Sequence, residues 1–153
     1  MKKNEKTIAV KSIISNGEQT VLNEATGVLE TVENVTITFE NGTLPFIKAG
    51  TFEDAECHSK VFPASYVLPA LKRGNADLAG IADFDVAKAH GLIAGGGTIT
   101  FAINEYEPGD TINDVEFKHK AYRYSIIGAT LNAAAQAYLK ANAEAKMKAI
   151  FGF

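Results

Sequence analysis

The stretch from Lys118 to Tyr124 holds the most unusual combination of side chains in the chain, Lys-His-Lys-Ala-Tyr-Arg-Tyr. Successive side chains of a strand point to opposite faces, so Lys118, Lys120, Tyr122 and Tyr124 share one face if this stretch is a strand. Lysine pairs with phosphate and a tyrosine ring stacks on an unpaired base, which is the chemistry of a surface that binds single-stranded nucleic acid. The alternative is an exposed strand whose lysines deter edge pairing while its tyrosines rest on the neighbouring strand.

The overall charge of the chain favours the structural alternative. Its 153 residues include 15 Lys and Arg against 18 Asp and Glu, a net charge of -3. Such a chain has no bulk attraction to nucleic acid or to an acidic lipid surface. Nucleic-acid binding by the four residues therefore stays the second hypothesis, and we expect no membrane partner.

The spacing of the cysteine and the histidines argues against a catalytic thiol and against a metal centre. Cys57, the one cysteine, is followed by His58, and neighbouring side chains on a helix or strand point apart, so these two cannot pair directly. The histidines at 58, 90 and 119 form no paired ligand spacing. We therefore expect no catalytic residue, no metal and no cofactor, and the chain is not predicted to be an enzyme.

The glycine triplet Gly95–Gly97 invites comparison with a phosphate-binding loop. Such a loop precedes a helix, whose N-terminus faces the anion, and often carries a lysine. Here the glycines run directly into a predicted strand at Thr98, with no Lys-Ser or Lys-Thr pair after them. The triplet is better interpreted as a flexible or close-packed connection.

Alternating apolar residues predict strands in the first and last thirds of the chain. Residues 34–40 and 98–104 both alternate with a period of two, the pattern of a half-buried strand. Asn-Gly pairs at 16–17 and 41–42 predict hairpin turns, because type I′ turns need two residues with positive φ. Pro108–Gly109 suits the centre of a type II turn.

Helices are predicted between these strand regions and at the end of the chain. Short helices are expected over residues 52–60, 65–72 and 83–91, the last with Asp83 as its cap. A longer helix is expected from Ala129 to Ile150, with Asn132 on its polar face. The chain is thus predicted to be a single α+β domain over residues 1–153. It has antiparallel β-sheets from residues 6–49 and 97–127, a short-helix insert and a C-terminal α-helix.

No secretory signal or membrane span is expected. The basic N-terminus is not followed by an uninterrupted apolar segment, because Lys11 interrupts residues 7–14. The charge-free stretch from Tyr124 to Leu139 is shorter than the roughly 20 residues that cross a bilayer. A cytoplasmic chain is the expectation, unless it is packaged into a particle.

The distribution of charge and the last residues favour assembly. Residues 12–47 carry five Glu and no base, whereas residues 118–153 carry six bases and one acid, Glu144. Opposite charges orient the association of copies, although solvated faces are the simpler explanation. Phe151 and Phe153 end the chain, and they either dock on their own domain or insert into a neighbouring copy.

These observations favour a non-enzymatic structural subunit of a large homo-oligomeric assembly, with a bacteriophage virion protein of the capsid or tail as the favoured instance. Its expected partners are copies of itself and other structural proteins of the assembly, with nucleic acid left open. Its expected location is the virion, after synthesis in the host cytoplasm. The alternatives are a nucleic-acid-binding module that uses the basic-aromatic strand, and a small ligand-binding or enzymatic domain without a readable motif.

Overall fold

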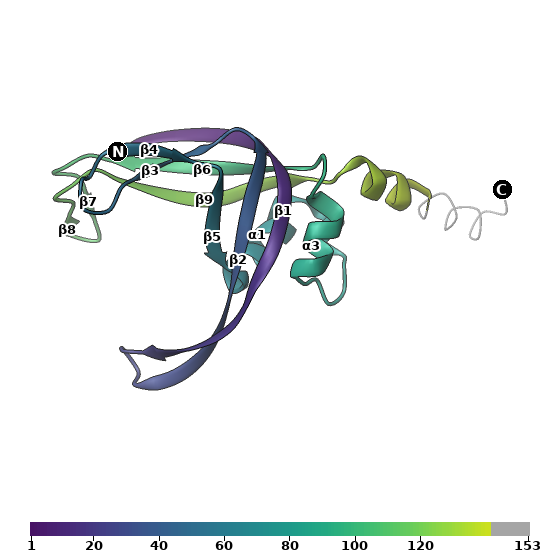
Figure 1. Cartoon of the computed structure of the whole chain (residues 1–153), viewed down its shortest axis with the longest axis horizontal. Helices are drawn as coiled ribbons and strands as arrows, with labels where there is room; N and C mark the ends of the chain where they lie inside the picture. The colour runs from purple at the N-terminus through teal and green to yellow at the C-terminus, as the bar shows by residue number, and fades with distance from the viewer. Residues whose placement is uncertain (142–153) are drawn as a thin grey trace.

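The computed structural model describes residues 1–141, and its central element is one five-stranded sheet (Figure 1). The strands, in spatial order, are β5 (Ser59–Pro63), β2 (Val28–Asn41), β1 (Lys2–Asn23), β6 (Thr98–Tyr106) and β9 (Ala121–Thr130). All neighbouring strands run antiparallel. The predicted α+β fold is confirmed, and the two strand regions form one sheet because β1 pairs with β2 along one edge and with β6 along the other.

Two small antiparallel ribbons and several short helices complete the fold. The ribbons pair β3 (Leu44–Ile47) with β4 (Asp54–Cys57), and β7 (Thr111–Ile112) with β8 (Val115–Glu116). The helices are α1 (Ala64–Gly74), α2 (Ala76–Ala79), α3 (Val86–Ile93) and a C-terminal helix over residues 133–141. Within the described part of the chain, no helix has the length and apolar character needed to cross a membrane.

The hydrophobic core lies between one face of the sheet and the helices α1 and α3. The alternating residues of β2 and β6 are buried as predicted, and Phe39 meets Phe101 edge to face with ring centroids 5.7 Å apart. Val67 and Leu71 of α1 and Ile93 of α3 have no exposed surface. The helices α1 and α3 therefore cover the apolar face of the sheet.

The two Asn-Gly pairs do not form the predicted hairpin turns. Asn16 and Gly17 lie inside β1, where the register shifts by one residue and Gly17 has a φ of 86°. This arrangement is a β-bulge, which bends the strand. Gly42 has a φ of 101°, but Asn41 does not have a positive φ, and β2 pairs with β1 and β5 rather than with β3. The turn between β1 and β2 is formed by residues 24–27 instead.

The predicted type II turn at Pro108–Gly109 is confirmed. The backbone N–H of Asp110 donates to the carbonyl of Glu107 at 3.1 Å, and Gly109 has a φ of 96°. A positive φ at the third position of the turn is the defining requirement of this type. The turn leads from β6 into the β7–β8 ribbon.

Gly42 is intolerant of a β-branched residue although it is not in a hairpin turn. Its φ is 101°, and an added Cβ would lie 3.4 Å from Cγ2 of the buried Ile8. We expect Gly42→Val to lower the free energy of unfolding by at least about 1 kcal/mol, measured by denaturant titration. Gly80→Val is the matched control, because Gly80 has a negative φ and open space around its Cα. An unchanged midpoint for Gly42→Val contradicts this account.

The helix predicted over residues 52–60 is wrong. This segment forms β4 and β5, which pair with β3 and β2, so long-range pairing overrides the local capping pattern. The helix predicted at 65–72 is confirmed as α1. The third helix, α3, begins at Val86 and is capped by Asp85, whose carboxylate accepts from the N–H of Lys88 at 2.8 Å. Asp83 is not the cap, because it has a φ of 51° in the preceding turn.

The C-terminal helix begins at residue 133 rather than at Ala129, because β9 continues to Thr130 opposite Thr98. Asn132 is buried rather than part of the predicted polar row. Its Oδ1 accepts from the N–H of Ala135, and its Nδ2 donates to the carbonyls of Gly91 and Ala94. Asn132 therefore caps this helix and joins it to the end of α3. The predicted contact residues Phe151 and Phe153 lie outside the described residues.

Candidate functional site

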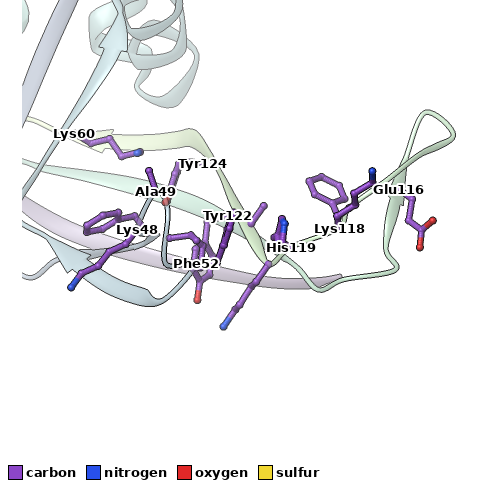
Figure 2. Close-up of a pocket in the computed structure, with 14 residues that line it drawn as sticks. Lys48, Ala49, Phe52, Lys60, Glu116, Lys118, His119, Tyr122 and Tyr124 are labelled. Carbon is purple, nitrogen blue, oxygen red and sulfur yellow. The ribbon is translucent and has the colours of Figure 1, made fainter.

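A groove of about 550 Å³ brings all four residues of the predicted basic-aromatic surface together (Figure 2). It lies between the β3–β4 connection and the segment that runs from β8 into β9. Lys118 and Lys120 precede β9 rather than belonging to it, so only Tyr122 and Tyr124 alternate along the strand. The groove is lined by Phe46, Ile47, Lys48, Ala49, Phe52, Lys60, Glu116, Phe117, Lys118, His119, Lys120, Ala121, Tyr122 and Tyr124.

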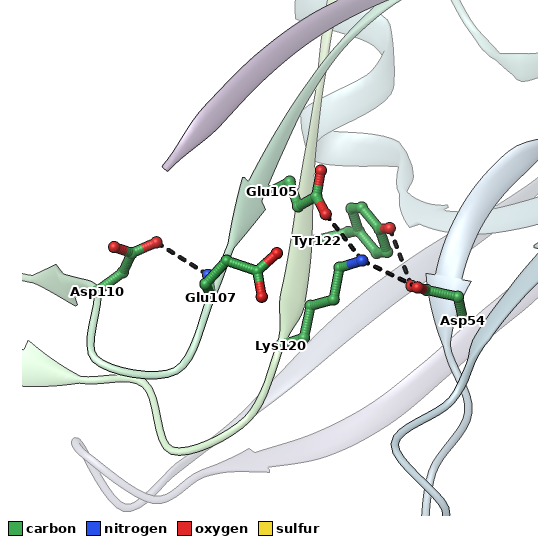
Figure 3. A network of polar contacts seen from close by, with 6 residues as sticks. All are labelled: Asp54, Glu105, Glu107, Asp110, Lys120 and Tyr122. Carbon is green, nitrogen blue, oxygen red and sulfur yellow. Dashed lines mark hydrogen bonds and ion pairs between the residues drawn. The ribbon is translucent and has the colours of Figure 1, made fainter.

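Lys120 is the centre of a polar network that joins three strands (Figure 3). Its Nζ lies 2.9 Å from Oδ2 of Asp54 in β4 and 2.8 Å from Oε1 of Glu105 in β6. The hydroxyl of Tyr122 in β9 donates to Oδ1 of the same Asp54 at 2.9 Å. The hydrogen bond from Lys120 lowers the pKa of each carboxyl group, and these bonds raise the pKa of Lys120. Lys120 therefore tethers the β3–β4 ribbon to the sheet and is not free to bind a phosphate.

Acid should weaken this tether. The pKa values of Asp54 and Glu105 are lower in the folded chain than in the unfolded one, so the unfolded state takes up protons first as pH falls. The contribution of these two carboxylates to stability is fully present above about pH 5 and is lost as pH falls below about 4. The raised pKa of Lys120 changes stability only in strong alkali, where lysine loses its proton. Urea unfolding of the wild type and Lys120→Gln at pH 7 and pH 3 tests this. The wild type should lose more stability than the variant, and an identical pH dependence contradicts the tether.

The two tyrosines are held by the fold rather than presented to a ligand. Tyr122 donates to Asp54, and the hydroxyl of Tyr124 donates to the carbonyl of Pro45. Burial is the main cause that raises the pKa of both phenols, so both remain hydrogen-bond donors. Nζ of Lys60 lies 4.4 Å from the ring centre of Tyr124, which places a cation where a stacked base would lie.

Three lysines of the groove make no ion pair within residues 1–141: Lys48, Lys60 and Lys118. Sequence reasoning identified only Lys118. Lys48 follows β3 and Lys60 lies in β5, far from Lys118 in the chain, so only the folding of the β3–β4 ribbon against β9 brings them together. No spacing rule marks such a cluster in advance.

The cysteine and the histidines occupy separate places in the fold. The thiol of Cys57 donates to the carbonyl of Leu44, and Nδ1 of His90 accepts from the N–H of Ile13. His119 stacks on Phe52 with ring centroids 3.8 Å apart. In the described part of the chain, no three His, Cys, Asp or Glu side chains lie close enough to hold a metal ion.

The second feature of note is the far half of the β1–β2 hairpin, residues 18–33, which we call the arm. It curves away from the rest of the molecule (Figure 1). Its strands pair from Glu18 opposite Glu33 to Asn23 opposite Val28, which extends about 20 Å. No residue of the arm is buried, although the same two strands contribute Val10, Ile13, Val35 and Ile37 to the core.

Apolar side chains lie on both faces of the arm. Leu22 and Leu29 are opposite each other and share one face, and their exposed fractions are 57% and 68%. Val21 and Val28 lie at positions of the other face, with exposed fractions of 42% and 56%. The ribbon is nevertheless well formed, since the side chain of Asn23 accepts from the N–H of Ala25 in the turn. This hairpin therefore has apolar surface that the rest of the described chain, residues 1–141, does not cover.

Comparison of the chain with known protein families, with curated proteins and with solved structures finds no match. The interpretation of the groove and the arm therefore depends on their own geometry and chemistry.

Proposed function

We propose that the chain is a non-enzymatic structural subunit of a large homo-oligomeric assembly. The favoured instance is a bacteriophage virion protein, of the capsid or the tail, that is made in the host cytoplasm and resides in the virion. Its partners are further copies of the chain and other structural proteins of the particle.

The arm is the observation that carries this proposal. An isolated two-stranded hairpin is marginally stable in water and usually needs a third strand or a packed face. Within residues 1–141 the arm has neither around Val21, Leu22, Val28 and Leu29, yet these four side chains are exposed, two on each face of the ribbon. Burying a valine or leucine side chain stabilises a contact by about 1.5–3 kcal/mol. A neighbouring subunit that covers the arm therefore supplies the packing that the chain itself lacks.

Among the described residues, the C-terminal helix offers a second exposed apolar surface, at a different side of the molecule from the arm (Figure 1). Ala134, Ala137, Tyr138 and Ala141 are exposed on it, and Tyr138 is 65% exposed. Small side chains allow another helix or sheet to approach closely, and surfaces of this kind mark protein contacts. Two separate contact surfaces on one small chain are what a repeating subunit needs to extend an assembly.

Electron microscopy of the purified chain tests the virion proposal. We expect regular particles, and their shape distinguishes the two instances: closed shells indicate a capsid role, whereas rings or tubes indicate a tail role. A field of isolated small particles at concentrations far above those found in cells contradicts assembly by the chain alone.

The groove favours a second candidate function, the binding of single-stranded nucleic acid. Lys48, Lys60 and Lys118 line one concave surface together with aromatic rings, and both kinds of side chain contact single strands in proteins. Against it, Lys120 is neutralised by two carboxylates, and the tyrosine hydroxyls are bound within the fold. This function therefore depends on Lys48 and Lys118 more than on the tyrosines.

If the groove binds nucleic acid, removing two of its lysines should reduce the salt dependence of binding. We expect Lys48→Ala with Lys118→Ala to weaken binding to a single-stranded oligonucleotide and to reduce the slope of log K against log salt by about 1.4. The matched control is Lys72→Ala with Arg73→Ala at the end of α1, which removes the same charge elsewhere. Equal retention of the oligonucleotide by all three chains leaves no role for the groove in such binding.

A further inference from the structure

We propose that the arm of one copy seats in the basic-aromatic groove of the next copy, so that the subunits join head to tail. This inference rests on the proposed function and adds to it the two surfaces that meet and the order in which copies connect.

The charges of the two surfaces are complementary. The arm, residues 18–33, carries four Glu and neither Lys nor Arg. The groove presents Lys48, Lys60 and Lys118, whose ammonium groups make no ion pair in the described part of the chain, against the single acid Glu116. Opposite charge across an interface steers association and fixes its orientation. Two copies of the arm repel each other, so an arm-to-arm contact is disfavoured by the same charges.

The apolar parts also correspond. Phe46, Phe52 and Phe117 line the groove, and Phe52 is 49% exposed although it stacks on His119. The paired Leu22 and Leu29 form an apolar strip on one face of a narrow ribbon, and the pair Glu18–Glu33 lies farther along the same face. Aromatic side chains provide large contact areas, and interfaces commonly place them at their centre with a charged rim. The arm and the groove share this arrangement of apolar centre and charged surround.

Both surfaces are unpartnered within one copy. None of the residues that line the groove belongs to the arm, and within residues 1–141 no hydrogen bond or ion pair joins the two. A contact between two different surfaces of identical chains leaves a free arm at one end and a free groove at the other. It therefore continues from copy to copy, and the assembly closes into a ring or extends as a filament.

Charge reversal on each side, alone and together, tests this contact. The arm variant is Glu18→Lys with Glu24→Lys, and the groove variant is Lys48→Glu with Lys118→Glu; all four side chains are exposed, and Glu18 shares the face of Leu22. Each variant should lower the association constant of the chain by at least about tenfold, measured by sedimentation. The chain with all four changes should recover to within about threefold of the wild type, since opposite charges again face each other. Glu5→Lys with Glu40→Lys is the control, because it adds the same charge outside the arm.

The outcomes separate this inference from the proposed function. A wild-type chain that stays monomeric overturns both. If the wild type assembles and the groove variant assembles equally well, the inference alone is overturned. It is also overturned if the chain with all four changes does not recover the association constant of the wild type. Loss of single-stranded DNA retention by the groove variant, with assembly unchanged, assigns the groove to nucleic acid instead. Variants that stay monomeric like the wild type but melt at different temperatures indicate an arm that folds onto its own groove, which also contradicts the inference.

Discussion

Replacing Val21, Leu22, Val28 and Leu29 with serine should dissociate the assembly and leave the domain folded. These side chains are more than two-fifths exposed and contribute nothing to the buried core. Each loses part of the 1.5–3 kcal/mol that burial in a contact provides, so the association constant should fall at least about a hundredfold. Sedimentation measures this fall, and the melting temperature should stay within about 2 °C of the wild-type value at dilutions where both chains are monomeric.

The control for this variant is Val61→Ser with Ile127→Ser. These two side chains are 54% and 45% exposed, but they lie on β5 and β9 rather than on the arm. The control should therefore assemble as the wild type does. If the control dissociates the assembly and the arm variant does not, the contact surface lies on the sheet and the arm has no part in it.

Gly97→Ala should be among the most destabilising single substitutions in the chain. An added Cβ at Gly97 would meet the carbonyl oxygen of Thr130 at 2.5 Å and that of Ile93 closer still. Both atoms are backbone, and Gly97 is itself held by Val10, whose N–H donates to the Gly97 carbonyl at 2.9 Å. The crossing of α3, β1 and β9 must therefore shift. We expect a loss of about 3 kcal/mol, which lowers the melting temperature by about 6–12 °C.

Gly91→Ala is the matched control for Gly97→Ala. Gly91 lies inside α3, and its Cβ would have nothing within 4 Å. Alanine is the better helix former, so this change should be neutral or stabilise the chain by up to about 1 kcal/mol. Calorimetry of both variants checks the pair. A Gly97→Ala chain that melts with the wild type contradicts close packing at the triplet, and favours the flexible connection that was the other interpretation of the sequence.

The sequence predicted which residues form the core better than it predicted the turns. Alternation in residues 34–40 and 98–104 marks the buried face directly, because a strand buries every second side chain. The pair Asn16–Gly17 carries the same local signal as a hairpin turn, yet it forms a bulge because β1 keeps its partner on both sides of it. Residues 52–60 begin with a helix-capping pattern but pair with β2 and β3. Local sequence signals carry no information about which strand a segment will pair with. Pairing with a distant strand determined the structure both at Asn16–Gly17 and in residues 52–60.

The candidate site was predictable only in part, because composition marks a local stretch but not the residues that it meets in the fold. The stretch from Lys118 to Tyr124, which its composition singled out as one strand face, lines a groove, although only its second half belongs to a strand. The partners that neutralise Lys120, Asp54 and Glu105, lie on other strands, and no spacing connects them to it. The arm was not predicted, because the sequence pattern indicates one strand from Thr20 to Leu29 after Asn16–Gly17, whereas residues 24–27 within it form the turn. What covers a strand is a property of the fold: in the described chain α1 lies beside Val32 at the base of the arm, whereas Val28 and Leu29 stay exposed.

The solution mass of the unmodified chain, measured by sedimentation equilibrium from low to high concentration, tests the central claim most directly. The account predicts species at multiples of 16.3 kDa that grow with concentration and shrink as salt screens the charges of the arm and the groove. A mass that stays at 16.3 kDa at every concentration and salt contradicts self-assembly through the arm.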